Sequence, residues 1–266
     1  VIATLNKITI EKSQFLSKLQ YFSYLGRSFS KLKDHTQAIE VFKRALAISF
    51  NTPSSTGEDK LMAQVYYDLG LEYHQAIIDE IRRAGLKDFA LIVKTSQLFQ
   101  EALEFFAKAL DLWKNFQDFP SIITGHQIIG NIYGYLKNPT EQITHYREAL
   151  RYAEKINDFA QLIKISELLI AILNTSHLYS EITDLIDHTL DLLMKHAYQD
   201  PMANARMYYY LGLSKFQSKN HAAALSDLLM ALNILQKQDL RVPVEHDTLH
   251  RSEEHTSELQ SRQVSS

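Results

Sequence analysis

The chain has no cysteine among its 266 residues, which excludes disulfide bonds and thiolate metal sites. Only eight glycines and five prolines are present, which leaves room for long uninterrupted helices. No run approaches the roughly 18 apolar residues of a transmembrane helix. The net charge is −3 and the basic residues are scattered, so neither nucleic acid nor an anionic membrane meets a basic patch. The hydrophobic fraction of 45% is that of a folded protein.

The two ends of the sequence look unusual. Val1 is preceded by no initiator Met, and no signal-peptide layout follows it, so we expect an internal fragment of a cytoplasmic protein. Residues 251–261 read RSEEHTSELQS, which resembles the in-frame translation of a short-read sequencing adapter. We therefore expect residues 251–266 to be non-native, the native sequence to stop near His250, and both ends to be truncated.

The sequence offers no arrangement that catalysis or cofactor binding would need. The His-Glu-x-x-His spacing and both glycine-rich phosphate-binding patterns are absent. His188 and His196 are eight residues apart on one expected helix, too far for one metal ion. Acidic pairs such as Asp184 and Asp187 fit a solvated helix face. We therefore expect no enzyme activity, no metal and no cofactor.

A short string recurs along the chain, consisting of Leu or Ile, then Gly, then an aromatic residue three or four places later. Four of the eight glycines occupy this place, namely Gly26, Gly70, Gly130 and Gly212. Glycine inside a helix costs about 1 kcal/mol relative to alanine, so its recurrence predicts close helix–helix approach in each copy.

A second string follows each of these glycines. In the first copy this string consists of Ala38, Phe42 and Ala45. The offsets of four and three place all three residues on one helix face. A small–large–small stripe lets neighbouring helices approach around one bulky side chain. The small positions of the other clear copies are Ala102, Ala109, Ala149, Ala224 and Ala231.

These strings resemble the tetratricopeptide repeat, whose first helix carries Leu-Gly and Tyr and whose second carries Ala, Phe and Ala. The usual period is ~34 residues, whereas the later copies here repeat at about 40–42. The resemblance implies an all-α, right-handed superhelix of about five helix pairs. It also implies a protein-binding scaffold.

The resemblance places repeats at approximately 15–49, 59–116, 119–156, 159–196 and 201–237, in one domain over 1–250. The fourth copy lacks the glycine and the small residues, with Leu169, Ile170 and Leu173 in the first string and Ile182, Ile186 and Thr189 in the second. The second copy carries about 20 extra residues near 77–97. We interpret them as lengthened helices, and a tolerated surface insertion remains the alternative.

In this family the first helices of the pairs line a concave groove. Positions three before, one after and four after the glycine should point into it, as Ser23, Arg27 and Ser30 would in the first copy. The surface would be neutral and hydrogen-bonding, with aromatic patches suited to a peptide. The predicted groove residues are Tyr67, His74, Gln127, Asn131, Tyr135, Glu167, Asn174, Arg206 and Tyr209.

Two functions remain open at this point. One is a scaffold that binds a partner protein or peptide in the groove, and the other is a peptide-sensing regulatory domain of a larger protein. A basic clamp for a terminal carboxylate is not expected, because Ser23 and Gln127 stand where Lys would be needed. The last pair should also expose an apolar face after Gln236 and promote self-association, because terminal repeats need a polar cap.

Overall fold

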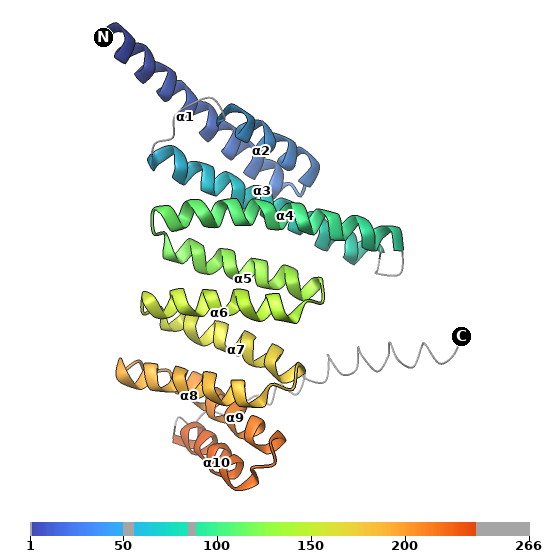
Figure 1. Ribbon diagram of the computed structural model, residues 1–266, viewed down its shortest axis with the longest axis vertical. Helices are drawn as coiled ribbons and strands as arrows, with labels where there is room; N and C mark the ends of the chain where they lie inside the picture. Colours follow the sequence, from blue (N-terminus) through green and yellow to red (C-terminus); the bar gives the residue numbers. More distant parts are fainter. Residues whose placement is uncertain (1, 50–55, 85–88, 238–266) are drawn as a thin grey trace. The chain divides into compact units, whose positions relative to one another are not determined.

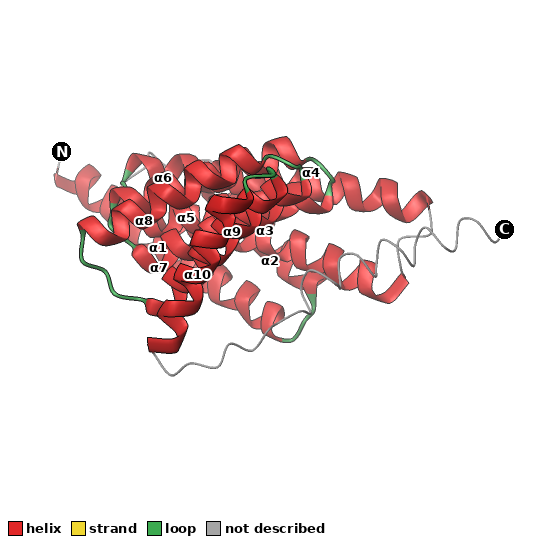
Figure 2. Ribbon diagram, turned by 90° about the horizontal axis from the view of Figure 1, so that it is seen from below, coloured by secondary structure: helices red, strands yellow, loops and turns green. Residues whose placement is uncertain are grey.

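The computed structural model describes the backbone of residues 2–49, 56–84 and 89–237, and the side chains of residues 15–48, 57–83 and 97–237. Within these ranges the chain forms ten α-helices and no strand (Figure 2). The predicted all-α class is therefore confirmed. The expected non-native tail, residues 251–266, lies outside the described residues.

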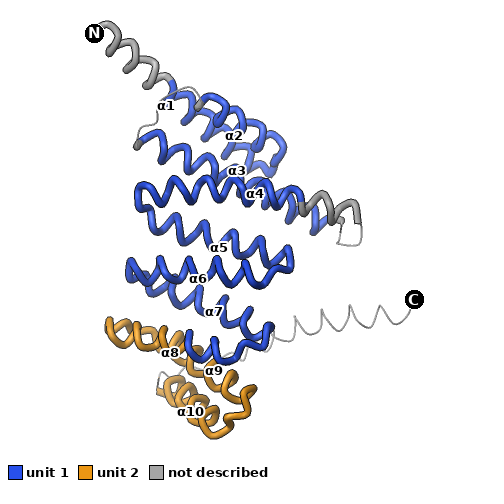
Figure 3. Tube along the Cα trace, viewed as in Figure 1, with its two compact units in different colours: residues 1–185 blue, residues 186–266 orange. Residues whose placement is uncertain are grey.

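The chain divides into two compact units, residues 1–185 and 186–266, with the boundary inside one helix (Figure 3). The helices are α1 (Ile2–Lys31), α2 (His35–Ser49), α3 (Thr56–Ala84), α4 (Phe89–Asn115), α5 (Phe119–Tyr135), α6 (Pro139–Lys155), α7 (Phe159–Thr175), α8 (Tyr179–Lys195), α9 (Pro201–Gln217) and α10 (His221–Lys237). The odd-numbered helices are called first helices and the even-numbered ones second helices.

In unit 1 each helix packs on the next one along the chain, from α1 to α7 (Figure 1). Apart from these neighbours, α1 also contacts α3. The core is therefore a continuous layer between successive helices, and it includes the fully buried Phe42, Phe106 and Tyr146. In unit 2, α9 packs on α10. Contacts between sequence neighbours are what a stack of helical repeats produces.

Several of the helices begin at side-chain caps. Asp118, Asn138, Asp158 and Asp200 each accept a hydrogen bond from the backbone N–H three residues later. Such a cap satisfies one of the free N–H groups at a helix start. In three of these helices, α5, α6 and α9, a proline occupies the first or second position, where its missing N–H costs nothing.

Seven of the helices end in a shared turn, and in the described part of the chain its left-handed position is not a glycine. After α1, the Asp34 N–H donates to the Phe29 carbonyl at 3.0 Å and the Lys33 N–H to the Ser30 carbonyl at 2.9 Å. This is the Schellman pattern, which places the residue after the helix in the left-handed region. Seven non-glycine residues adopt that conformation at helix ends, with φ from 52° to 64°: Lys33, Gln117, Lys137, Asn157, His177, Ala197 and Lys219.

The recurring glycines lie against the large residue of the second string. A Cβ atom on Gly130 would lie 3.0 Å from Tyr146 Cε1, and one on Gly70 would lie 3.2 Å from the Phe106 ring. In unit 2 a Cβ on Gly212 would lie 2.7 Å from Leu228 Cγ. A side chain at any of these positions would force the paired helix outward, which is the physical reason that the glycine recurs.

The second copy has lengthened helices. α3 runs 14 residues past Gly70, whereas α5 ends five residues past Gly130. α4 is correspondingly long, with 27 residues against 17 in α6. The helix extension expected from Ala76 is therefore present, while Gly85, its expected end, lies outside the described residues.

The degenerate fourth copy keeps its apolar register without the glycine. Leu169, Ile170, Leu173 and Ile182 are buried in unit 1, and Ile186 and Thr189 are buried in unit 2.

Among the described residues, no helix is long and apolar enough to cross a lipid bilayer.

Candidate functional site: the surface of the first helices

The predicted groove residues on α3 and α5 form an aromatic group at one point. The His74 ring lies 6.0 Å from the Tyr135 ring and 6.2 Å from the Phe99 ring, and Phe99 stacks on Tyr135 at 5.8 Å. Tyr135 is more than half exposed although its ring is held in this stack. The group is therefore a packed cluster from α3, α4 and α5 whose exposed member is Tyr135. Phe99 is a member that the sequence did not predict.

His74 carries two polar atoms that the fold does not satisfy. Nδ1 and Nε2 are both shielded from solvent and find no hydrogen-bond partner among the described residues. Burial lowers the pKa of His74, so its ring is neutral at pH 7. A neutral imidazole has one donor and one acceptor. Unsatisfied buried polar groups are costly, so each one needs an explanation such as a bound water or a functional role.

Asn131 is exposed on α5, the helix that carries Tyr135, and its amide is already partly used. The Tyr146 hydroxyl donates to Asn131 Oδ1, which fixes the side chain against the core of its own repeat. The two N–H donors of the amide take no part in that bond. A bidentate pair with a peptide amide, as expected from the sequence, would have to share the oxygen with Tyr146.

Tyr67 and Gln127 are less open than predicted. The Tyr67 ring lies 5.8 Å from Phe106 and 5.4 Å from Trp113, so it packs on the core of the second copy. The Gln127 amide donates to Gln161 Oε1 at 2.9 Å and links α5 to α7. Both side chains are half-buried. Tyr67 and Gln127 therefore contribute more to the packing beneath the surface of the first helices than to that surface itself.

The remaining predicted residues are not brought together. Glu167 and Asn174 are half-buried on α7 in unit 1. Arg206 and Tyr209 belong to α9 in unit 2, where Tyr209 is exposed with its ring 5.7 Å from Tyr210. In unit 1 the predicted residues that lie close together are thus His74 and Tyr135.

The first copy is closed by an ion-pair network that the sequence analysis missed. Arg27 Nε donates to Asp68 Oδ2 at 2.7 Å, and Gln64 Nε2 donates to Asp68 Oδ1 at 2.8 Å. Burial raises the pKa of Asp68, while the Arg27 and Gln64 hydrogen bonds act against this rise. Ser23 is buried rather than facing a groove. The Arg27 guanidinium is therefore already paired within the chain, with Asp68 of α3.

The network continues one helical turn further along α3. Ser30 donates to the buried Glu72, and His35 Nδ1 lies 2.8 Å from the same carboxylate. The other ring nitrogen of His35 lies 3.3 Å from Asp79. The His35 hydrogen bond is the largest cause that lowers the pKa of Asp79. The sequence offered a signal for the contact between Ser30 and Glu72. Both residues lie on first helices, shortly after the recurring glycines Gly26 and Gly70.

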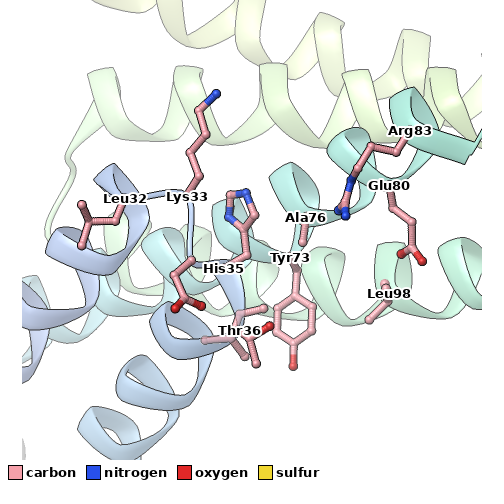
Figure 4. A pocket seen from close by; sticks show the side chains of 11 residues that line it. Leu32, Lys33, His35, Thr36, Tyr73, Ala76, Glu80, Arg83 and Leu98 are labelled. Atoms are coloured by element: carbon pink, nitrogen blue, oxygen red, sulfur yellow. The ribbon is translucent and has the colours of Figure 1, made fainter.

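A cavity of about 580 Å³ opens beside this network (Figure 4). The α1–α2 turn supplies Leu32 and His35, and α3 supplies Tyr73 and Ala76. Leu98 of α4 also lines it. The lengthened part of α3 is what walls this cavity, because α5 ends at the corresponding place. The extra residues of the second copy thus supply a wall of this cavity at the edge of the helix pair.

Two histidines meet between α5 and α6. His126 Nδ1 and His145 Nδ1 are 3.0 Å apart, so one ring donates to the other. Burial, followed by the charge that His145 would carry, lowers the pKa of His126 to about 4. Among the described residues no third His, Asp or Glu completes a metal-binding group with them. The pair stays neutral near pH 7 and acts as part of the helix interface.

The successive helix pairs, each with a glycine packed against a bulky side chain of its partner helix in the clear copies, define a protein built of α-helical repeats. The model of the tetratricopeptide repeat family matches residues 24–52 and 124–156. These two segments match the tetratricopeptide repeat, and the predicted resemblance is confirmed. Among curated proteins, none matches this sequence.

Solved structures share the fold at low sequence identity. BtubC (BKLC) from P. vanneervenii is 14% identical with a TM-score of 0.53, and the alignment covers 90% of this chain and 87% of that one. The TPR-like repeats of a putative kinesin light chain from Podosopora anserina are 13% identical with a TM-score of 0.53, covering 84% and 97%. MamA is 16% identical with a TM-score of 0.52, covering 85% and 98%. The tetratricopeptide repeats that the family model matches support a protein-interaction scaffold in general.

Proposed function

We propose that this chain is a scaffold that binds an extended peptide segment of a partner protein across α3 and α5. The observation that carries the proposal is the aromatic group of His74, Phe99 and Tyr135, whose exposed member lies at a predicted groove position. Aromatic side chains held rigidly at a surface give contact area at low entropic cost.

The hydrogen-bonding groups near the aromatic group suit a neutral peptide. Asn131 offers amide donors, and the neutral His74 ring offers one donor and one acceptor. The two His74 nitrogens are shielded from solvent and unsatisfied among the described residues, so a peptide would pair with them only after the neighbouring side chains move. A peptide backbone supplies both partners, because each residue except proline carries an N–H and a carbonyl.

The neighbouring first copy limits where the peptide can gain charge interactions. Arg27 is already paired with Asp68, so a terminal carboxylate would have to break that bond to reach it. Breaking a partly buried ion pair costs more than a new exposed pair returns. The proposed partner is therefore recognised by apolar and amide contacts.

The proposal is tested with peptides selected from a random displayed library on the intact chain and measured by calorimetry. Tyr135→Ala removes the exposed ring, and we expect it to weaken binding at least tenfold, as hot-spot tyrosines do. Tyr24→Ala is the matched control, because Tyr24 is an exposed tyrosine of α1 away from the group. Equal affinities in the Tyr135 and Tyr24 variants would refute the assignment.

The role of Asn131 needs a variant that keeps its bond to Tyr146. Asn131→Asp preserves an acceptor for the Tyr146 hydroxyl and removes both amide donors. We expect weaker peptide binding with unchanged thermal stability. Unchanged binding would exclude the amide from recognition.

The same proposal describes a non-catalytic adaptor of the cytoplasm without a nucleic-acid partner. It is supported by the repeat family and by the scattered basic residues of a chain with net charge −3. A peptide-sensing regulatory domain would use the same surface on α3 and α5. The two functions differ in what the binding event controls.

A further inference from the structure

Helix α10, the last one in the described part of the chain, carries an exposed apolar face. Leu225, Leu229 and Leu232 follow one another at spacings of four and three along α10, and all three are exposed. Ala224 and Ala231 are buried on the side that packs on α9. The exposed leucines therefore form a stripe on a different side of the helix, which we call the α10 leucine stripe.

Part of this stripe is the surface that second helices use for stacking. Leu232 follows Ala231 as Leu46 follows Ala45, Leu110 follows Ala109 and Leu150 follows Ala149. Those three leucines are at most 9% exposed, whereas Leu232 is 50% exposed. In α4 the leucine is covered by the next first helix, since a Cβ on Gly125 would lie 2.9 Å from Leu110 Cδ2.

The stripe is also wider than stacking requires. Leu229 corresponds to Lys43 in α2, Ala107 in α4 and Arg147 in α6, and all three are exposed although the next helix is in place. A leucine at this position is not explained by a neighbouring repeat. It adds apolar area beyond the surface that a first helix covers.

The stripe is self-complementary. An antiparallel second α10 with its two-fold axis near Leu229 would set Leu225 of each copy against Leu232 of the other. Isologous contacts require this kind of symmetric patch. The exposed neighbours Ser226, Asn233 and Gln236 are uncharged, so two copies meet without repulsion. The carboxylate of α10, Asp227, is paired with Lys215 of α9 at 2.8 Å.

We propose that a second copy of this chain covers the α10 leucine stripe, helix against antiparallel helix, in a two-fold dimer. A helix of 17 residues is about 25 Å long, so the contact buries less than the roughly 1,200 Å² of a standard interface. The dimer is therefore weak, with dissociation in the micromolar range, on the order of 1–100 µM. This inference does not depend on the peptide site proposed on α3 and α5.

Sedimentation velocity of the intact chain from about 1 to about 200 µM tests the dimer by mass action. We expect a concentration-dependent shift from monomer to dimer that Leu229→Glu abolishes, because two carboxylates would meet at the axis. Leu32→Glu changes an exposed leucine of the α1–α2 turn and should leave the shift intact. A monomer throughout, or a dimer that survives Leu229→Glu, overturns the proposal.

The absence of cysteine allows a second test of the symmetry. Under mild oxidation Leu229→Cys should form a covalent dimer, and Leu32→Cys should not. A mixture of the Leu225→Cys and Leu232→Cys chains should form a mixed dimer faster than either chain alone. Cross-linking of the Leu32→Cys chain as fast as that of the Leu229→Cys chain would overturn the two-fold arrangement.

Discussion

Gly26 of α1 faces the ring of Phe42 in α2 so closely that a Cβ atom on it would lie 2.5 Å from Phe42 Cε1. Phe42 is fully buried, and the two alanines of its stripe are buried with it. The ring thus fills the space that the glycine leaves, and the separation of the two helices depends on this pair.

We expect Gly26→Ala to lower the free energy of unfolding by about 1–2 kcal/mol, because the steric overlap outweighs the gain in helix propensity. Urea titration followed by the fluorescence of Trp113, the chain's only tryptophan, measures this change. Gly57→Ala is the control, since no neighbouring group lies within 4 Å of a Cβ built there. A stabilised Gly26→Ala protein would contradict the close approach.

Ala197, in the turn that follows α8, has a φ of 52°, a conformation that glycine adopts more easily than alanine. Ala197→Gly should therefore stabilise unit 2 by about 1 kcal/mol. The same substitution at Ala107, an exposed residue inside α4, should destabilise unit 1 by about 1 kcal/mol. Thermal melting followed by circular dichroism compares the two, and shifts of the same sign would rule out the left-handed turn.

The His126–His145 pair predicts a loss of stability in acid. The pKa of His126 is lowered to about 4 in the folded chain, so below about pH 6.5 the unfolded chain binds more protons. The associated stability is present above pH 6.5 and is lost as the pH falls towards 4, by up to about 3 kcal/mol.

His126→Phe keeps a ring against Tyr152 and should flatten this pH dependence. Unfolding midpoints between pH 4 and pH 7 provide the measurement, with Glu148 and Lys114, the nearby charges, left unchanged. An equally steep acid loss in the variant would show that other groups cause it.

The Arg27–Asp68 pair predicts a coupled effect of two substitutions. Arg27→Met leaves the partly buried Asp68 carboxylate without its main partner and should cost about 1–2 kcal/mol. Adding Asp68→Asn removes the charge and should restore most of that loss. A double-mutant cycle on urea unfolding measures the coupling, and additive effects would mean that solvent already screens the pair.

The helix pairs and their register could be predicted because the physical cause repeats along the chain. A glycine against a large residue between two small ones has one geometric solution, and Gly26, Gly70 and Gly130 all reach it. The caps at Asn138 and Asp200 are equally local, because each side chain bonds to its own helix start.

The candidate site was less predictable because exposure depends on the neighbouring helix. The position three before the glycine is buried at Ser23, packed on Trp113 at Tyr67 and exposed at Tyr209, although the pattern treats these residues alike. Phe99 was missed because it belongs to a second helix, and only the three-dimensional packing brings it to Tyr135.

The left-handed turns were missed for a different reason. Glycine is the usual signal for them, and here residues such as Lys137 and Ala197 adopt the conformation instead. Two backbone hydrogen bonds of the turn, and the side-chain cap of the helix that follows, stabilise the left-handed conformation. They do so without a recognisable sequence pattern.

The central claim, peptide recognition by the aromatic group of α3, α4 and α5, is tested most directly by site-specific photo-cross-linking. A benzophenone amino acid would replace Tyr135 in one chain and Tyr24 in another, and each would be irradiated with the selected peptide. We predict a covalent adduct at position 135 and none at position 24. An adduct at 24 without one at 135 would contradict the proposed site.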